Sequence, residues 1–434
     1  MRTIEIRDEA SYREAERRLC GLSGGVDAER DAQEKVKAVQ EIIAAVRERG
    51  DAAVAEFTAR FDRVSLRPEA FEVPPEAIDD AYARVDAALL AALGRAYGHI
   101  REFHGKHLRE SWEEVSADGT VLGQRITPIA SVGVYVPGGK AFYPSSVLMN
   151  IVPAAVAGVR EIIMVSPPSY EGSIYPAVLA AAKMAGVTRV FRIGGAQAVA
   201  ALAYGTEHVP AVLKITGPGN TYVTVAKRLV RTVCDIDSEA GPSEVVVIAD
   251  ETADPRYVAV ELLAQAEHDE EARVALLTPS RSLAEQVQKQ VEQEMATLPR
   301  TQTIRQSLDG YGAIVLVRSL EEAIKLTNRV APEHVSIQTA SPREVLEGIE
   351  NAGAVMLGAM TPVAVGDYYA GPNHILPTGG RARFSSPLTA EDFRKVTNVL
   401  SYSTERLRQA APDIRRLAEA EGLTAHARAV EVRL

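Results

Sequence analysis

Cysteine is nearly absent from this chain of 434 residues, which contains Cys20 and Cys234 and no others. A single pair of cysteines cannot form the disulfide framework of a small secreted protein, and it cannot supply a zinc cluster built from thiolates. A metal site in this protein would therefore have to use histidine, aspartate, glutamate or amide side chains.

The chain also lacks an excess of positive charge and a long apolar run. Its formal net charge is -10, and acidic and basic residues are interspersed along the sequence rather than grouped into a basic stripe. We therefore expect no nucleic-acid partner. The most apolar stretch, 147–159, contains Asn150 and Pro153 and is too short to span a bilayer as a helix. The N-terminus has no apolar segment typical of a signal peptide. We therefore expect a cytoplasmic protein without a membrane span.

Short apolar runs alternate with alanine-rich helical stretches over most of the chain. Residues 31–107 show helical spacing of apolar side chains, and 121–136 predict β-structure. Further helices are expected over 146–158, 176–185 and 257–267. The continuous runs that predict strands are Glu161–Val165, Val187–Ile193, Val212–Ile215, Glu244–Ile248, Val274–Leu277, Ala313–Val317 and His334–Ile337.

Continuous runs of this kind are typical of parallel strands covered on both faces. The pattern predicts an α/β fold with two doubly wound, Rossmann-like units, one on each side of Gly241, and helical N-terminal and C-terminal extensions. At the C-terminus, helices are expected over 390–401 and 403–421. At 434 residues with 46% hydrophobic composition, the chain is too long for one ordinary core and should divide into two or more packed domains.

No G-x-G-x-x-G fingerprint of a dinucleotide site occurs between a strand and a helix. Three glycine-rich segments stand instead where a strand is expected to end: GVYVPGG (133–139), IGGAQA (193–198) and ITGPGN (215–220). Any one of them is better explained as a tight turn that needs positive φ. Three such strand ends in one domain favour a nucleotide or phosphate ligand.

The histidines in the first half of the chain carry little functional signal. His99, His104 and His107 lie on a predicted helix or at its end, and the last two have the spacing of a metal pair. Their charged neighbours favour a solvated helix face instead. His208 follows Glu207 in a polar turn, and we expect it on the surface.

Two later segments each offer a pair of functional side chains. Gln265 and His268 stand three residues apart near the end of a helix and could begin a metal site, although a histidine that caps the helix is the commoner explanation. Glu333 and His334 lie at a strand start, where an acid and a proton acceptor would meet at a loop mouth. Isolated pairs of this kind are common, so neither is decisive by itself.

The segment GDYYAGPNHILPTGG, 366–380, is the loop of the chain richest in glycine, proline and polar or aromatic side chains. Loops of this composition on an α/β scaffold carry function more often than packing, and Asp367 is a plausible carboxylate ligand with His374 as its rival. Glu421 and His426 lie near the C-terminus, where spacing alone would leave them exposed and inert.

Several segments, taken together in this order, resemble the histidinol dehydrogenase family over essentially the whole chain. They are VYVPGG, YPSSVLMN, GGAQAVAALAYGT, KITGPGN, AGPSEVVVIAD, AQAEHD, APEHV, GDYYAGPNHILPTGG and GLTAHA. The joint match is far more specific than any single motif. One departure is visible, because Ser238 stands where family members often have methionine.

The resemblance implies an NAD-dependent oxidoreductase that converts L-histidinol to L-histidine through the bound aldehyde, with zinc in the site. It assigns Glu333 and His334 as the acid-base pair and leaves His374 in a structural role. It implies zinc ligands at Gln265, His268, Asp367 and His426, NAD contacts at Tyr135, Gln197 and Asn220, and substrate contacts at Ser243, Gln265, His268, His334, Asp367, Glu421 and His426.

With these roles, the expected organisation is an N-terminal extension (1–30), a first α/β domain (31–129 with 238–380) that carries most metal and catalytic residues, a second NAD-binding α/β domain (130–237) and a helical C-terminal arm (381–434). The resemblance implies a homodimer in which the arm is exchanged and the active sites are shared.

Two other functions compete with this interpretation. A zinc amidase or esterase would use Glu333 to activate water without NAD, and a non-catalytic nucleotide-binding or regulatory protein would show no turnover. Formation of NADH from NAD and histidinol separates all three. Both alternatives leave the ordered set of matching segments unexplained.

Overall fold

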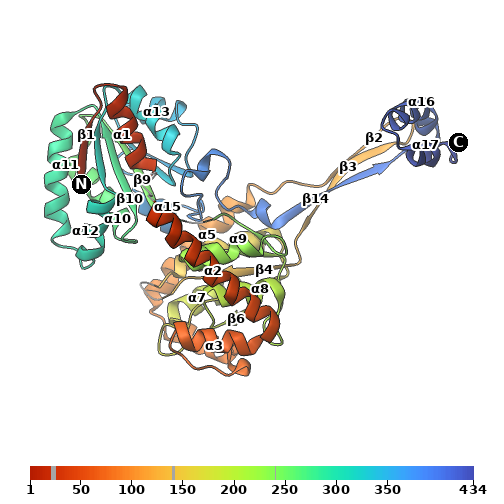
Figure 1. Ribbon diagram of the computed structural model, residues 1–434, viewed down its shortest axis with the longest axis horizontal. Helices are drawn as coiled ribbons and strands as arrows, with labels where there is room; N and C mark the ends of the chain where they lie inside the picture. Colours follow the sequence, from red (N-terminus) through yellow and green to blue (C-terminus); the bar gives the residue numbers. More distant parts are fainter. Residues whose placement is uncertain (21–25, 139–141, 240) are drawn as a thin grey trace.

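The computed structural model describes residues 1–20, 26–138, 142–239 and 241–434. Gly139 of the first glycine-rich segment, Ala240 of AGPSEVVVIAD and residues 21–25 of the expected N-terminal extension lie outside the described residues. The described chain forms two α/β units and a projecting arm (Figure 1). The predicted α/β class with parallel sheets is confirmed. Within these ranges, no helix combines the length and apolar character that crossing a membrane requires.

The five-stranded unit contains a parallel sheet in the order β6-β5-β4-β7-β8. Its strands are continuous apolar runs because helices cover both faces of the sheet. Helix α6 starts at Pro144 and stops at Gly158, which adopts a left-handed conformation that ends helices. Strand order reverses between β4 and β7. The elements are β4 (Ser131–Tyr135), α6 (Pro144–Ala157), β5 (Glu161–Val165), α7 (Pro176–Ala185), β6 (Arg189–Phe191), α8 (Gly195–Tyr204), β7 (Lys214–Thr216), α9 (Thr221–Val230) and β8 (Asp235–Ile236).

The six-stranded unit repeats this topology with one more strand, in the order β1-β11-β10-β9-β12-β13. All its strand pairs are parallel, and the order reverses between β9 and β12. The elements are β9 (Glu244–Ala249), α10 (Pro255–Ala266), β10 (Arg273–Thr278), α11 (Arg281–Met295), α12 (Thr301–Gly310), β11 (Ala313–Leu316), α13 (Leu320–Val330), β12 (His334–Gln338), α14 (Pro342–Glu347), β13 (Ala354–Leu357) and α15 (Val363–Tyr368).

The N-terminal segment belongs to the six-stranded unit. Strand β1 (Arg2–Glu5) pairs with β11 at the edge of that sheet, and helix α1 (Glu9–Cys20) packs against α13. Buried Ile4, Ala15 and Leu19 join the same apolar core as Val335 and Ile337 of β12. Residues 1–20 are therefore part of the six-stranded unit rather than an extension separate from it.

The expectation that residues 31–129 belong with 238–380 is wrong for the N-terminal helices. These helices form where the spacing predicts them, but they pack on the five-stranded sheet. Val39 and Val46 of α2 share a core with Ile163 and Phe191, which lie on β5 and β6. Helical spacing identifies an apolar face but not the sheet that covers it. The helices are α2 (Val26–Arg49), α3 (Asp51–Phe61), α4 (Pro75–Arg84) and α5 (Ala87–Gly105), with the short 3-10 turn η1 (Pro68–Ala70).

The arm is a β-ribbon that ends in two helices, rather than a helical extension throughout. Strand β3 pairs antiparallel with both β2 and β14, and the ribbon carries the C-terminal helices to the far end of the molecule (Figure 1). The helix expected over 390–401 is wrong, because its backbone bonds are made to β3 instead. The elements are β2 (Trp112–Val115), β3 (Val121–Pro128), the short turns η2 (Arg381–Arg383) and η3 (Ala390–Phe393), β14 (Arg394–Ser401), α16 (Thr404–Ala420) and α17 (Thr424–Glu431).

The two units meet through residues 366–380, at opposite edges of their sheets. Ser146 lies in the first turn of α6, which follows the carboxyl end of β4, and its Oγ is 3.1 Å from Nε2 of His374. At the other end of the segment, the N–H of Gly379 donates to Oε1 of Glu244, the first residue of β9, at 3.2 Å. The carboxyl edge of the five-stranded sheet thus faces the amino edge of the six-stranded sheet.

Candidate active site

Glu333 and His334 stand at the amino end of β12 and are both buried. Oε2 of Glu333 accepts the backbone N–H of Glu244 at 2.9 Å and lies 3.5 Å from Nδ1 of His334. The same Nδ1 is 3.1 Å from the backbone oxygen of Glu244, which can accept its hydrogen. The pair predicted at a loop mouth is therefore held against the start of the neighbouring strand β9.

Three predicted metal ligands gather around His334. Gln265, on the last turn of α10, places its amide nitrogen 3.1 Å from Nδ1 of His334. Oδ1 of Asp367, on α15, lies 3.6 Å from Nε2 of the same ring. His268 follows α10 and is close enough to Asp367 to lower the pKa of its carboxyl. The structure brings Gln265, His268 and Asp367 together, as the resemblance implies.

Charge in this cluster is strongly coupled. Burial alone would lower the pKa of His334, but the carboxylates of Glu333 and Asp367 outweigh it and raise the pKa to about 10. Burial would raise the pKa of Asp367, and His334 outweighs it so that the pKa is lowered. Nε2 of His334 is nevertheless buried without a hydrogen-bond partner among the described residues. It is a nitrogen positioned to engage a further group.

His374 orients Asp367 from the side of the five-stranded unit. Its Nδ1 lies 2.9 Å from the backbone oxygen of Asp367, and its Nε2 faces the hydroxyl of Ser146. Burial lowers the pKa of His374, so the neutral ring can donate through Nδ1 and accept through Nε2. The neighbouring Asn373 donates to the backbone oxygen of Met149 at 2.7 Å. His374 thus connects the backbone of Asp367 to Ser146 of the five-stranded unit.

The three residues predicted to contact NAD lie along the carboxyl edge of the five-stranded sheet. Tyr135 ends β4, Gln197 lies in the first turn of α8, and Asn220 caps α9. Tyr135 and Asn220 flank the point where the strand order reverses, which is where open α/β sheets bind nucleotides. Gln197 is 0% exposed, and neither atom of its amide has a hydrogen-bond partner among the described residues. Such an amide fits a polar ligand.

Backbone geometry at this edge requires glycine. Gly217 has a φ of 108°, and a Cβ there would lie 2.1 Å from the backbone oxygen of Tyr135. Buried Lys227 holds the loop from below through the oxygen of Gly217, at 2.8 Å, and through Asp237. Lys227 also donates to the backbone oxygen of Ser238 at 3.3 Å. Ser238 stands where family members often have methionine, and its side chain takes no part in this bond.

The other histidines differ from expectation in two places. His107 is exposed as predicted, but His104 is 0% exposed and neither of its ring nitrogens has a partner among the described residues. His208 is not a free surface residue, because its Nδ1 lies 2.6 Å from Asp51. With Glu207, these two form a group of side chains of metal-ligating type that is separate from the cluster around His334. Helix packing, which local charge cannot predict, causes both differences.

The sequence matches the family model of histidinol dehydrogenase over residues 26–434. The chain belongs to the histidinol dehydrogenase family. The histidinol dehydrogenase of Halalkalibacterium halodurans is 50% identical over 434 residues, covering 100% of this chain and 99% of that protein. That of Heliobacterium mobile is 52% identical over 404 residues, covering 93% and 94%. The crystal structure of histidinol dehydrogenase from Elizabethkingia anophelis superimposes with a TM-score of 0.92 at 34% identity, covering 100% of this chain and 98% of that one.

Two site residues implied by the histidinol dehydrogenase family are not brought to the cluster within this chain. Glu421 caps the end of α16 and His426 lies on α17, and both are exposed. These helices stand at the far end of the arm, remote from α10 and α15 (Figure 1). Ser243, the remaining implied substrate contact, is half-buried directly before β9.

Glu244 is the residue of this site that sequence reasoning missed. It adjoins Ser243 in AGPSEVVVIAD, where the sequence pattern predicts only the start of a strand. It touches both Glu333 and His334, and it is 6% exposed. The available signal was its charge, because a glutamate that opens a fully buried parallel strand needs a partner.

Proposed function

We infer that this protein oxidises L-histidinol, through bound L-histidinaldehyde, to L-histidine with reduction of two NAD, the final steps of histidine biosynthesis. Membership in the histidinol dehydrogenase family supports the reaction. The structural observation that carries it is the meeting of Glu333 and His334 with Gln265, His268 and Asp367 in one buried cluster.

The cluster fits a zinc ion. Zinc takes imidazole nitrogen and carboxylate or amide oxygen, which His268, Asp367 and Gln265 can supply from adjacent sides. The orphaned Nε2 of His334 faces this group and remains available for the substrate hydroxyl. When bound, zinc would fix the imidazole and amino nitrogens of histidinol, and NAD would accept the hydride in each oxidation.

The acid-base pair divides the two oxidations. His334 takes the hydroxyl proton of histidinol as the carbinol carbon loses hydride, giving the aldehyde. The carboxylate of Asp367 helps to raise the pKa of His334. When that carboxylate also neutralises a bound cation, it stabilises the protonated ring of His334 less. The neutral ring, which this step needs as proton acceptor, is then favoured. Glu333 then removes a proton from a water molecule as the oxygen of that water bonds to the aldehyde carbon. The anionic hydrate formed in this way loses a second hydride to NAD, which gives the carboxylic acid, and loss of one further proton gives the carboxylate of histidine.

The NAD contacts proposed are Tyr135, Gln197 and Asn220. They lie on the carboxyl edge of the five-stranded sheet, which faces the amino edge that carries Glu333 and His334 across residues 366–380. The start of α9 also offers backbone N–H groups to an anionic ligand. This placement lets the nucleotide occupy one unit while the substrate is held by the other.

The arm is proposed to complete the site of a second subunit in a homodimer. In this chain α17 lies far from the cluster, so His426 cannot serve it without another copy. Apolar side chains are exposed on the two parts that the exchange would bring together. They are Tyr257 and Val260 on α10, Met360 and Tyr368 before and on α15, and Leu400, Leu417, Leu423 and Val432 on the arm. Their burial in a dimer would favour association.

The reaction is tested by product stoichiometry. Purified protein of defined zinc content is mixed with histidinol and excess NAD, and NADH and amino acid are quantified. We expect two NADH for each histidinol consumed, with histidine accumulating. One NADH with free aldehyde would refute the two-step reaction, and hydrolysis without NADH would favour the amidase alternative.

Arm exchange is tested by mixing two inactive variants, His334→Asn and His426→Asn, in denaturant and refolding them together. In a mixed dimer, one site receives both lesions and the other an intact core and an intact arm. Random pairing should restore roughly a quarter of wild-type activity. If the arm serves its own chain, the mixture stays as inactive as each variant alone while reassembly of dimers is still detected.

A further inference from the structure

Glu244 links the two proposed catalytic residues to residues 366–380. Its side-chain Oε2 accepts the backbone N–H of Glu333 at 3.3 Å, and Oε1 accepts that of Gly379 at 3.2 Å. Its own backbone N–H donates to Oε2 of Glu333 at 2.9 Å, and its backbone oxygen lies 3.1 Å from Nδ1 of His334. One residue therefore contacts the acid, the imidazole and the loop segment that begins at the proposed zinc ligand Asp367.

The exchange between Glu244 and Glu333 is reciprocal. Each carboxylate accepts the main-chain N–H of the other residue, across the junction where β9 and β12 begin to pair. The parallel ladder places His334 opposite Val245. A rotation of the Glu244 side chain would therefore release the backbone of Glu333 on one side and that of Gly379 on the other.

Resting on the proposed function, we propose that Glu244 is a positioning residue whose ionised carboxylate clamps the backbone of Glu333 and Gly379 and so aims the Glu333 carboxylate for oxidation of the aldehyde. A carboxylate is an acceptor at both oxygens, as two N–H donors require. Protonation turns one oxygen into a donor that faces an N–H, and one arm of the clamp is lost. The clamp therefore depends on ionisation.

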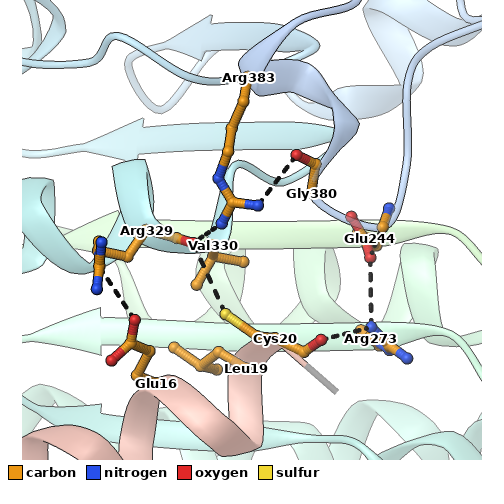
Figure 2. Close-up of a pocket in the computed structure, with 10 residues that line it drawn as sticks. Glu16, Leu19, Cys20, Glu244, Arg273, Arg329, Val330, Gly380 and Arg383 are labelled. Carbon is orange, nitrogen blue, oxygen red and sulfur yellow. Dashed lines mark hydrogen bonds and ion pairs between the residues drawn. The ribbon is translucent and has the colours of Figure 1, made fainter. Parts of the chain in front are cut away.

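Glu244 also lines a cavity of about 330 Å³, on the side of its carboxylate away from Glu333 and His334 (Figure 2). Arg273 of β10 enters it, with Nη1 3.7 Å from Oε1 of Glu244 and its Nε unpartnered among the described residues. Arg383 of η2 lines the same cavity and bonds the backbone oxygens of Gly380 and Arg329. The cavity thus places cationic side chains beside a buried carboxylate.

The charged and titratable groups around Glu244 act in opposite directions. Burial raises its pKa to about 7, Arg273 opposes that shift, and Glu333 adds to it. Arg383 and the thiol of Cys20, at the end of α1, are the further groups on the cavity side, and the Glu16–Arg329 ion pair closes its rim at 3.0 Å. The balance leaves Glu244 to change ionisation near neutrality.

The first test compares Glu244→Gln with a matched control, Glu322→Gln. Glu322 is also a buried glutamate that accepts a backbone N–H, from Arg318 at 2.8 Å, and pairs with an arginine, but it lies on α13 near the opposite edge of the same sheet. Rates of histidinol and histidinaldehyde oxidation are measured separately from pH 6 to pH 9, together with zinc content and thermal unfolding.

In Glu244→Gln we expect kcat for the aldehyde to fall about 10- to 100-fold at pH 8, with KM changed little and the alcohol step impaired less. The acidic limb of the aldehyde profile near pH 7 should disappear. Glu322→Gln should retain both rates. Equal losses in both steps, or a loss that parallels zinc release or a lowered Tm, would assign Glu244 a structural role and overturn the proposal.

A second pair of variants keeps Glu244 itself intact. Arg273→Met removes the cation that favours the carboxylate, so the acidic limb of aldehyde oxidation should move to higher pH, whereas Arg273→Lys should leave it near its wild-type position. An unmoved limb in Arg273→Met overturns the dependence on ionised Glu244. Failure of the wild-type protein to oxidise histidinol would instead refute the proposed function, independently of these variants.

Discussion

The five-stranded and six-stranded units share one strand order but use opposite edges of their sheets. In the five-stranded unit the proposed NAD contacts Tyr135 and Asn220 follow the carboxyl ends of β4 and β7, where strand order reverses. In the six-stranded unit Glu244 and His334 open the strands β9 and β12 that flank the equivalent reversal. The rule that ligands bind at carboxyl edges thus agrees with the proposed NAD contacts but not with the proposed catalytic residues.

Helix ends explain why each edge suits its ligand. At the carboxyl edge, α8 and α9 begin, and the positive ends of their dipoles favour the phosphates of a dinucleotide. At the amino edge of the other sheet α10 ends, so Gln265 and His268 lie at the negative end of a dipole, which favours a cation. Two copies of one topology, facing each other through opposite edges, therefore place the proposed NAD contacts and the proposed zinc ligands on facing edges.

The largest expected effect separates the two edges by removing the metal. After chelation, both oxidations should fall below about 1% of the zinc-loaded rate, because substrate is no longer oriented. NAD binding, followed by calorimetric titration, should persist, because Gln197 and Asn220 lie in the other unit. Restoring zinc should restore activity. Parallel loss of NAD affinity would contradict the separation of the two edges.

At the amino edge, variants of the two proposed catalytic residues should affect the two oxidation steps differently. His334→Asn should lower kcat for both oxidations by about 10²- to 10⁴-fold, because it removes the proton acceptor of the first step. Glu333→Gln should spare the alcohol step more than the aldehyde step. Single-turnover measurements with each substrate provide the test. Identical losses in both half-reactions for both variants would remove the division of labour.

Acid should weaken the two units differently. Burial, with a contribution from His107, lowers the pKa of His104 on α5 to about 4, below its unfolded value of 6.5, so the stability it contributes is present above pH 6.5 and lost as pH falls toward 4. Burial raises the pKa of Glu244 to about 7, above the unfolded 4.5, so its contribution is present below pH 4.5 and lost as pH rises toward 7. Of these two groups, His104 therefore loses its contribution to the five-stranded unit in acid, whereas Glu244 keeps its contribution to the six-stranded unit.

Urea unfolding at pH 7.5 and pH 4.5 measures this difference in His104→Leu. The wild-type protein should lose at most about 3 kcal/mol more unfolding free energy than the variant between these pH values. Probes should be placed in each unit so that the transitions are resolved. Equal pH dependence in wild type and variant would show that His104 does not carry the effect.

The smallest expected effect is a change in KM for NAD, and it compares the carboxyl edges of the five-stranded and six-stranded sheets. Gln197→Ala should raise KM for NAD about 10-fold and leave KM for histidinol unchanged, as expected for the loss of one buried hydrogen-bonding side chain. Gln338, which ends β12, is also buried with an unpartnered Oε1 among the described residues and provides the matched control. Gln338→Ala should not change KM for NAD. A comparable rise in that variant would place the nucleotide at both edges or at neither.

Much of this architecture could be predicted from local patterns. The runs 161–165, 244–248, 274–277 and 313–317 are strands, and the helix expected over 176–185 has those bounds. Continuous apolar runs are readable because parallel strands are buried on both faces. The prediction of a helix over 390–401 is wrong because β14 makes its backbone hydrogen bonds with β3, about 270 residues earlier in the sequence.

The sequence by itself determined the fold class, the family and the identity of the candidate site residues, because motif order and the period of apolar residues are local properties that survive without coordinates. Only the tertiary structure decided which sheet the helices of 26–105 cover, that the proposed NAD and catalytic residues lie on opposite edges, and that Glu244 joins Glu333 to Gly379. Those facts depend on contacts between residues distant in sequence, and such contacts are set by the packing of whole elements rather than by the residues on either side.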